Sequence, residues 1–456
     1  MDQKTFDDAI TETMELLDMS YSEALTDTIN QFQQLGMDMS KIKIKLELAD
    51  GPLPSALNKL KKSIEITHWN EIEINTIVDS LKTVEKECIT NEGQRLSKFS
   101  GAFEIICSYL ERLTDFNNDH KVQFIKTFEA LLSGGKQLIY GKALDIMVDM
   151  LKKTEHEGIL NALLSWFKVI SVTEDEREEL RIIGLSEILK NILLINSSNK
   201  EIISSTCQLI RAQIREDNCS GDFSNAGERS RLLACDVLEQ LIIIMKEDFI
   251  LESEDVTSEI FFTLATIIVR FEFCRKFNES GGLTRIKLAM EYHTTVKLNT
   301  QSFRLLKSLA GDDLVKDDIR KHGLCIHILS ALQRHINNKP LCIEAMKLIT
   351  TLCLRSPQNS TELIGIGVAE LIVQAMKVHS NDYKHQQHAC TAIRNIVSRN
   401  RELASEFLTL NVESIIEKII AQHKECEFEA KSALRDLGLE VKFKEQWTGK
   451  GQNLTQ

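Results

Sequence analysis

Hydrophobic residues recur along this chain at the spacing of an α-helix. Ala389, Ala392, Ile393 and Ile396 stand at i, i+3, i+4 and i+7, so they share one helical face. The same spacing returns in residues 430–437, a shift of 41 positions. Repeats of about 40–47 residues with two or three helices each are typical of helical solenoids.

Seven more faces with this spacing precede the two at the C-terminal end. We call each one a closing face, because it would lie on the last helix of its repeat. These seven begin at Ile74, Phe124, Leu160, Thr206, Ile260, Ser302 and Ala345. The pattern predicts about eight or nine repeats, of which the first is degenerate.

Glycines mark the same period, which supports the repeat independently. The positions predicted to open the middle helix of each repeat are Gly101, Gly141, Gly184, Gly227, Gly282, Gly323 and Gly367, followed by Asn411. Asparagine also tolerates the left-handed backbone conformation that such a junction uses. The wider interval between Gly227 and Gly282 predicts an insertion near residues 246–255.

The chain divides into three parts. Residues 1–50 predict an amphipathic helical hairpin that either caps the first repeat or binds a partner as a mobile arm. Residues 51–438 hold the repeats, with a turn-rich loop at 217–225 that is either a tolerated insertion or a functional projection. Residues 439–456 predict a C-terminal cap and a disordered tail.

Composition narrows the class of protein. The 456 residues include only 4 prolines, which suits an all-helical chain, and no run of 18 apolar residues predicts a membrane span. The acidic N-terminal sequence MDQKTFDDAI lacks the apolar core of a secretion signal. Eleven scattered cysteines favour a reducing compartment, so we expect the cytoplasm, with the nucleus as a second location. The net charge of −12 argues against nucleic-acid binding.

The segments GGLTRI, HGLCIHIL and GVAELIV, each followed by a closing face such as ACTAIRNI or AKSALRDL, resemble armadillo repeats across residues 52–438. The sequences at both ends of the chain are also similar to those of one group within the armadillo-repeat family. The resemblance implies a right-handed, all-α solenoid whose third helices line a concave groove, and an intracellular protein without enzymatic activity. Importin-like members typically carry an asparagine ladder on the third helix, whereas here only Asn395 occupies such a place.

The sequence contains little that indicates a catalytic or metal-binding site. Residues 132–137, LSGGKQ, resemble a transporter ATPase signature, but Ala143 stands where the Mg²⁺ ligand of a neighbouring phosphate-binding loop should be. His379, His385, His388 and Cys390 cluster in sequence, yet they are more readily explained as residues flanking a repeat than as metal ligands. No serine or cysteine has a recognisable histidine and acid partner. We expect no enzyme activity, no metal and no cofactor.

A partial column of basic residues is the best candidate for a binding site. Within a closing face, the residue that follows the third apolar position lies opposite the core. Those residues include Arg211, Lys307, Arg394 and Arg435. Arg304 and Lys347 lie one helical turn earlier on their helices. Trp166 and Asn395 occupy neighbouring positions that would face the groove. A basic groove would attract an acidic peptide, and an exposed Trp166 would anchor an apolar side chain. The alternative is an ordinary solvated surface.

The function predicted from these features is a protein-binding scaffold or adaptor that acts as a monomer. The alternative is a cargo carrier or assembly chaperone that holds an extended acidic peptide. Partners are expected to be other proteins or acidic segments, without nucleic acid or membrane.

Overall fold

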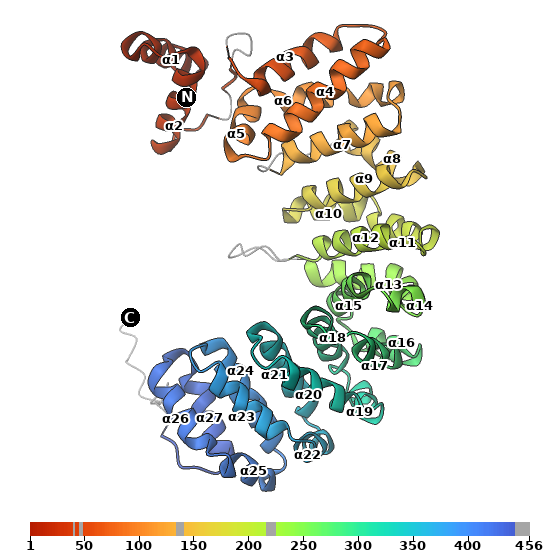
Figure 1. Ribbon diagram of the computed structural model, residues 1–456, viewed down its shortest axis with the longest axis vertical. Coiled ribbons are helices and arrows are strands. Elements are labelled where there is room, and N and C mark those ends of the chain that lie inside the picture. The colour runs from red at the N-terminus through yellow and green to blue at the C-terminus, as the bar shows by residue number, and fades with distance from the viewer. Residues whose placement is uncertain (40–41, 45–48, 134–140, 216–224, 443–456) are drawn as a thin grey trace, which may run out of the picture. The chain divides into compact units, whose positions relative to one another are not determined.

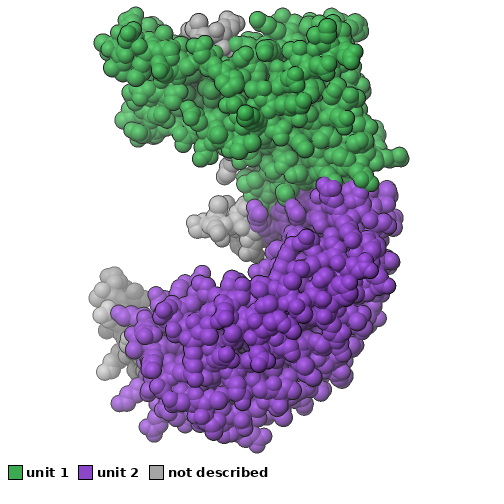
Figure 2. Space-filling model, in the orientation of Figure 1, with its two compact units in different colours: residues 1–188, 216–222 green, residues 189–215, 223–456 purple. Residues whose placement is uncertain are grey.

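The computed structural model describes residues 1–39, 42–44, 49–133, 141–215 and 225–442. Within these ranges the regular structure is helical and there is no β-strand. The chain forms two compact units, residues 1–188 in the first and residues 189–215 with 223–456 in the second (Figure 2). No helix in the described part of the chain is both long and apolar enough to cross a bilayer.

Unit 1 begins with a helical hairpin of α1 (Gln3–Leu17) and α2 (Tyr21–Gln34) (Figure 1). The helices start where the sequence provides caps: Asp2 accepts a hydrogen bond from the Thr5 amide, and Ser20 with Glu23 forms a capping box. The repeats of unit 1 follow as α3 (Pro52–Ile64), α4 (Glu71–Glu87), α5 (Asn91–Phe99), α6 (Ala102–Cys107), η1 (Leu110–Asp115), α7 (Asn118–Leu132), α8 (Lys142–Lys153), α9 (Glu157–Ile170) and α10 (Glu174–Ile182). Helix α11 (Leu185–Ile195) contains the boundary of the two units.

Unit 2 repeats a pattern of two short helices and one longer third helix. Its third helices are α12 (Lys200–Gln213), α15 (Glu254–Ile267), α18 (Val296–Leu309), α21 (Lys339–Cys353), α24 (Tyr383–Val397) and α27 (Glu427–Asp436). Between them lie α13 (Ala226–Met245), α14 (Asp248–Leu251), α16 (Phe271–Glu279), α17 (Gly282–Tyr292), α19 (Asp313–Lys321), α20 (Leu324–Arg334), α22 (Pro357–Gly365), α23 (Val368–Val378), η2 (Arg401–Leu403), α25 (Ala404–Thr409), α26 (Val412–Gln422) and η3 (Lys424–Cys426).

The third helices stack side by side within each unit. In unit 1, α4 packs on α7 and α7 on α9; in unit 2, the six third helices follow one another from α12 to α27 (Figure 1). All nine predicted closing faces lie on these helices and are buried, except for the half-buried Ile74. The amphipathic spacing therefore located the helices that hold the solenoid together.

Two of the predicted glycine junctions are wrong. Positive φ angles occur at Gly101, Gly141, Gly184, Gly323, Gly367 and Asn411, as expected, but the junction in the α16–α17 repeat is Gly281 (φ 78°) and not Gly282. Gly282 begins α17 and instead permits close packing, because a Cβ there would lie 2.2 Å from the Phe277 ring. Gly227 is the second residue of α13, a single 20-residue helix, and lacks the positive φ angle of the other junctions.

The remaining predicted segments are the insertion, the turn-rich loop, the ATPase-like sequence and the C-terminal tail. Residues 246–255, where the insertion is predicted, contain the short α14. Most of the predicted loop at 217–225, the segment 134–140 of the ATPase-like sequence, and the tail from residue 443 lie outside the described residues.

Four histidines join consecutive repeats of unit 2. Each follows the second helix of its repeat, and each Nε2 lies within hydrogen-bond distance of a backbone carbonyl one repeat earlier. These pairs are His293 with Leu251 (2.6 Å), His335 with Thr294 (2.6 Å), His379 with Ile336 (2.8 Å) and His423 with Ser380 (2.9 Å). Because a carbonyl only accepts, Nε2 carries the proton and donates. We call these four residues the histidine ladder.

Candidate partner-binding face

The candidate site lies on the third helices of unit 2, on the side away from their closing faces. We call this surface the third-helix face. Its polar and aromatic members are Arg211, Glu259, Phe262, Arg304, Lys307, Glu344, Lys347, His388, Arg394, Asn395, Arg435 and Asp436. The structure therefore brings seven of the eight predicted site residues onto one stack of helices. Trp166 belongs to α9 in unit 1.

Arg211 links two repeats. Its guanidinium forms an ion pair with the Glu259 carboxylate, donates 2.7 Å to Thr263 Oγ1 and lies over the Phe262 ring. Only 14% of its side chain is exposed. Since its donors are directed at α15, Arg211 acts mainly as a tie between α12 and α15, and little of its charge is presented to a partner.

Two cations, Arg304 and Lys347, lie near the Glu344 carboxylate, and a third, Lys307, lies on α18 one turn after Arg304. We call Arg304, Lys307, Glu344 and Lys347 the Glu344 cluster. Lys347 Nζ lies 3.1 Å from Glu344 Oε1, and Arg304 Nε approaches the same oxygen at 3.8 Å from α18. Lys307 lies one turn after Arg304 and has no carboxylate within ion-pair distance among the described residues. The cluster holds three positive charges and one negative charge.

Arg394 and Arg435 share one acidic residue at the C-terminal end of the face. Asp436 lies 3.4 Å from Arg394 Nε and 2.7 Å from Arg435 Nη2. Asp436 is mostly buried, whereas about half of the Arg435 side chain, 55%, is exposed. This ion pair joins α24 to α27 and still leaves Arg435 in contact with solvent.

Several side chains at the asparagine-ladder positions form hydrogen bonds within the protein. Asn395 Nδ2 donates 2.9 Å to the Thr350 carbonyl, and Ser308 Oγ donates 2.9 Å to the Ala265 carbonyl. Thr266 and Thr351 donate to carbonyls of their own helices. These side chains join repeats or satisfy helix carbonyls, which differs from the peptide-reading ladder of importin-like proteins.

The predicted exposure of Trp166 is wrong. Its side chain is fully buried, and its ring centre lies 5.5 Å from that of Phe128 and 5.0 Å from that of Phe167. The helical position alone suggested an exposed place, but the neighbouring aromatic rings enclose it. Trp166 therefore belongs to the core of unit 1 and offers no anchor to a partner.

The histidines grouped in the sequence occupy different environments. His385 is fully buried, and burial followed by the nearby His379 lowers its pKa to about 4. His388 is half-buried and its pKa is lowered by burial and then by the charge of Lys347. His379 belongs to the histidine ladder. Among the described residues, no group of three histidine, cysteine or acidic side chains is placed to hold a metal ion.

The buried cysteines are unsuited to nucleophilic chemistry. Burial raises the pKa of Cys207 to about 11 and that of Cys353 to about 12, so both thiols stay protonated near neutral pH. A reactive cysteine needs a lowered pKa instead. These residues act as small core side chains.

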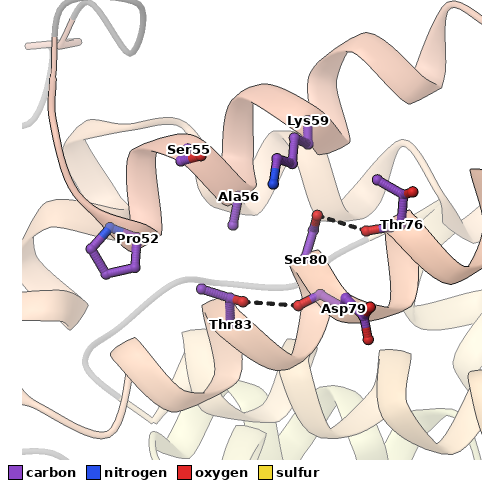
Figure 3. Close-up of a pocket in the computed structure, with 8 residues that line it drawn as sticks. All are labelled: Pro52, Ser55, Ala56, Lys59, Thr76, Asp79, Ser80 and Thr83. Carbon is purple, nitrogen blue, oxygen red and sulfur yellow. Dashed lines mark hydrogen bonds between the residues drawn. The ribbon is translucent and has the colours of Figure 1, made fainter.

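A pocket of about 390 Å³ lies between α3 and α4 in unit 1 (Figure 3). Three of its hydroxyl groups donate to carbonyls of their own helix: Thr76 to Ile72, Ser80 to Thr76 and Thr83 to Asp79. Asp79 forms an exposed ion pair with Lys82 at 3.4 Å. The eight lining residues include no histidine or cysteine.

Comparison with known families agrees with this architecture. The ARMC6 family model matches residues 54–456, and the model of the armadillo repeat-containing protein 6 N-terminal domain matches residues 1–50. The chain belongs to the ARMC6 family. The resemblance to armadillo repeats drawn from the sequence is therefore confirmed, and so is the all-α armadillo solenoid.

Full-length relatives within the ARMC6 family share about a quarter of their residues with this chain. The armadillo repeat-containing protein 6 homolog of Drosophila melanogaster is 28% identical, covering 98% of this chain and 97% of the relative. The armadillo repeat-containing protein 6 of Homo sapiens is 26% identical, covering 99% and 93%. These relatives match the chain from end to end.

Solved structures with the same fold are more distant in sequence. An engineered protein superposes with a TM-score of 0.66 at 16% identity, covering 84% of this chain and 88% of that one. A structure from work on the interaction between cadherin and beta-catenin gives 0.56 at 12% identity, covering 83% and 69%. At such identities the likeness concerns the fold alone. Armadillo-repeat proteins are typically non-catalytic and bind other proteins.

The histidine ladder is what the sequence interpretation missed. Its members recur at intervals of 42, 44 and 44 residues, which is the period of the repeat itself. This period is visible in the sequence. Among the sequence motifs, His379 is compared with the nearby His385 and His388 as candidate metal ligands, and not with the equivalent histidines of other repeats.

Proposed function

We propose that this member of the ARMC6 family is a non-enzymatic scaffold or adaptor that binds partner proteins on the third-helix face of unit 2. The observation that carries the proposal is the Glu344 cluster, in which three cations of α18 and α21 accompany one carboxylate in a chain whose net charge is −12. A local excess of positive charge on an acidic protein attracts acidic segments and speeds their encounter.

The acidic character expected of the partner follows from the same charges. Arg304 and Lys347 are each about one-third exposed, so water screens them less than it screens a fully exposed lysine. The fold is suited to this role, because stacked repeats present a continuous surface to an extended segment. The binding should weaken as the salt concentration rises.

The proposal is tested by affinity capture and mass spectrometry with a charge-reversed protein. The variant carries Lys307→Glu, Lys347→Glu and Arg435→Glu, and leaves Arg211 and Arg394 intact because those residues tie α12 to α15 and α24 to α27. A matched control carries Lys190→Glu, Lys377→Glu and Lys418→Glu, which are exposed lysines outside the third-helix face. Circular dichroism checks that both are folded.

We expect partners that are lost from the charge-reversed protein and kept by the control. Identical partner lists from the unmodified protein and the charge-reversed variant would contradict the proposal. Attention would then move to the hairpin of α1 and α2.

A cargo carrier or assembly chaperone is the second candidate, favoured by Lys307, which has no ion-pair partner in the described part of the chain and lies one turn after the partly exposed Arg304. A carrier holds one extended segment, so an added short acidic peptide should displace its partner completely. A scaffold that contacts folded surfaces should retain its partner under the same conditions.

We also propose a cytoplasmic location. Ten cysteines lie in the described residues as free thiols, which suits a reducing compartment. Fluorescence microscopy of the tagged full-length protein tests this location.

A further inference from the structure

We infer that the Glu344 cluster is a receptor for one acidic side chain, a carboxylate or a phosphate group, carried by an extended peptide. The inference rests on the proposed function and names the chemical group that the third-helix face would recognise. It assigns the contact to Arg304, Lys307 and Lys347, with Glu344 as the residue that positions two of them.

Glu344 is placed to hold cations from two helices. Its side chain is 11% exposed, and its Oε1 faces Lys347 on its own helix and Arg304 on α18. Because one carboxylate neutralises one charge, the cluster retains an excess of two positive charges. The geometry is partly preorganised, which lowers the entropy lost when a ligand binds.

Lys307 adds a cation that is free to bind. It is half-buried on α18, one turn after Arg304, and has no ion-pair partner among the residues that the structure describes. Burial and the charges of Lys347 and Lys307 lower the pKa of His388 on α24, whereas Glu344 and Glu429 raise it. Arg304 on α18 faces Glu344 on α21, and α21 in turn packs on α24.

Phe262 provides an apolar surface beside the cluster. The Arg304 guanidinium carbon lies 5.1 Å from the centre of the Phe262 ring, which is half-buried on α15. A peptide whose acidic residue meets the cluster would place a neighbouring apolar side chain near this ring. The combination favours a peptide over a nucleic acid, because a single cluster of three cations cannot follow a phosphate backbone.

The test uses three synthetic peptides of about 12 residues, which reach about 40 Å when extended. They share one neutral sequence of serine, threonine and leucine and carry at the centre two aspartates, two asparagines or two phosphoserines. Binding to the full-length protein is measured by fluorescence anisotropy at about 0.05 M and about 0.15 M salt. The variants are Lys307→Ala and Lys347→Ala, with Lys377→Ala on α23 as the matched control.

We expect an acidic peptide to bind at least about tenfold more tightly than the asparagine peptide. Each cluster variant should weaken that binding about three- to tenfold, while the control should not. Binding of both acidic peptides assigns a carboxylate or phosphate ligand, and binding of the phosphoserine peptide alone assigns a phosphorylated partner. Lys307→Ala removes no ion pair, so its effect on binding does not depend on a change in folding.

Three results would overturn the inference. They are equal binding of the asparagine and acidic peptides, unchanged affinity in both cluster variants, and an equal loss in Lys377→Ala. A single-stranded RNA that binds more tightly than either acidic peptide and depends on Lys307 would replace the peptide as the occupant. If captured partners are lost from the combined charge-reversed variant while the peptides ignore Lys307 and Lys347, the scaffold function stands and only this inference fails.

Discussion

The guanidinium carbon of Arg211 lies 4.5 Å from the centre of the Phe262 ring, although the two residues belong to different repeats. The same guanidinium pairs with Glu259 and donates to Thr263, so one side chain of α12 makes three kinds of contact with α15. A residue predicted to contact a partner is thereby also a link between repeats.

Arg211→Ala should lower the free energy of unfolding by about 2 kcal/mol, because it removes charge-assisted hydrogen bonds and leaves Glu259 without this partner. Urea denaturation followed by circular dichroism measures the change. Lys307→Ala is the control and should alter stability by no more than about 0.5 kcal/mol. Equal stability of the Arg211 variant and the unmodified protein would show that the link contributes nothing.

His335→Ala should lower the free energy of unfolding by about 1 kcal/mol, because the Thr294 carbonyl loses the donor that joins two repeats. Hydrogen exchange should also become faster in the loop that contains Thr294. His322 provides the comparison, since its ring contacts the Asp318 carbonyl within its own stretch of chain. If His322→Ala has as large an effect as His335→Ala, the histidine ladder has no special role.

Acid should destabilise the protein through His385. Its pKa is lowered from 6.5 to about 4 in the folded state, so below pH 6.5 the unfolded chain binds a proton that the folded chain does not. Stability is therefore complete above pH 6.5 and falls as the pH approaches 4, by about 2 kcal/mol at about pH 5. The loss of stability is measured by urea unfolding of the unmodified protein and of His385→Leu, above pH 6.5 and at about pH 5. The variant should lose less stability than the unmodified protein between these pH values.

Two glycines should respond in opposite directions to alanine. Gly282→Ala should destabilise by about 1–3 kcal/mol, because the new methyl group would overlap the fully buried Phe277 ring. Gly227→Ala should stabilise by about 0.4–1 kcal/mol, because Gly227 has a backbone conformation that alanine can adopt and a Cβ there meets nothing within 4 Å. Thermal unfolding measures the melting temperature of each variant. A shift of the melting temperature in the same direction for both variants would contradict the prediction.

Local pattern predicted the repeat well but its junctions less well. The closing faces were located because burial of one helical side depends on a spacing that each sequence segment carries by itself. The junction at Gly281 was placed one residue late, because two adjacent glycines satisfy the same period. The prediction at Gly227 was wrong because a glycine can also take the ordinary helical conformation, as Gly227 does in the first turn of α13.

The sequence by itself determined the class of fold, the length of the repeat and the helices that form its core, because these depend on periodic burial along one chain. Tertiary structure decided which polar side chains remain available. Arg211 and Asn395 are engaged by neighbouring repeats, Trp166 is enclosed by aromatic rings, and Arg304 shares Glu344 with Lys347. Such outcomes depend on residues about 40 positions apart, whose distances and directions are fixed only when the repeats pack.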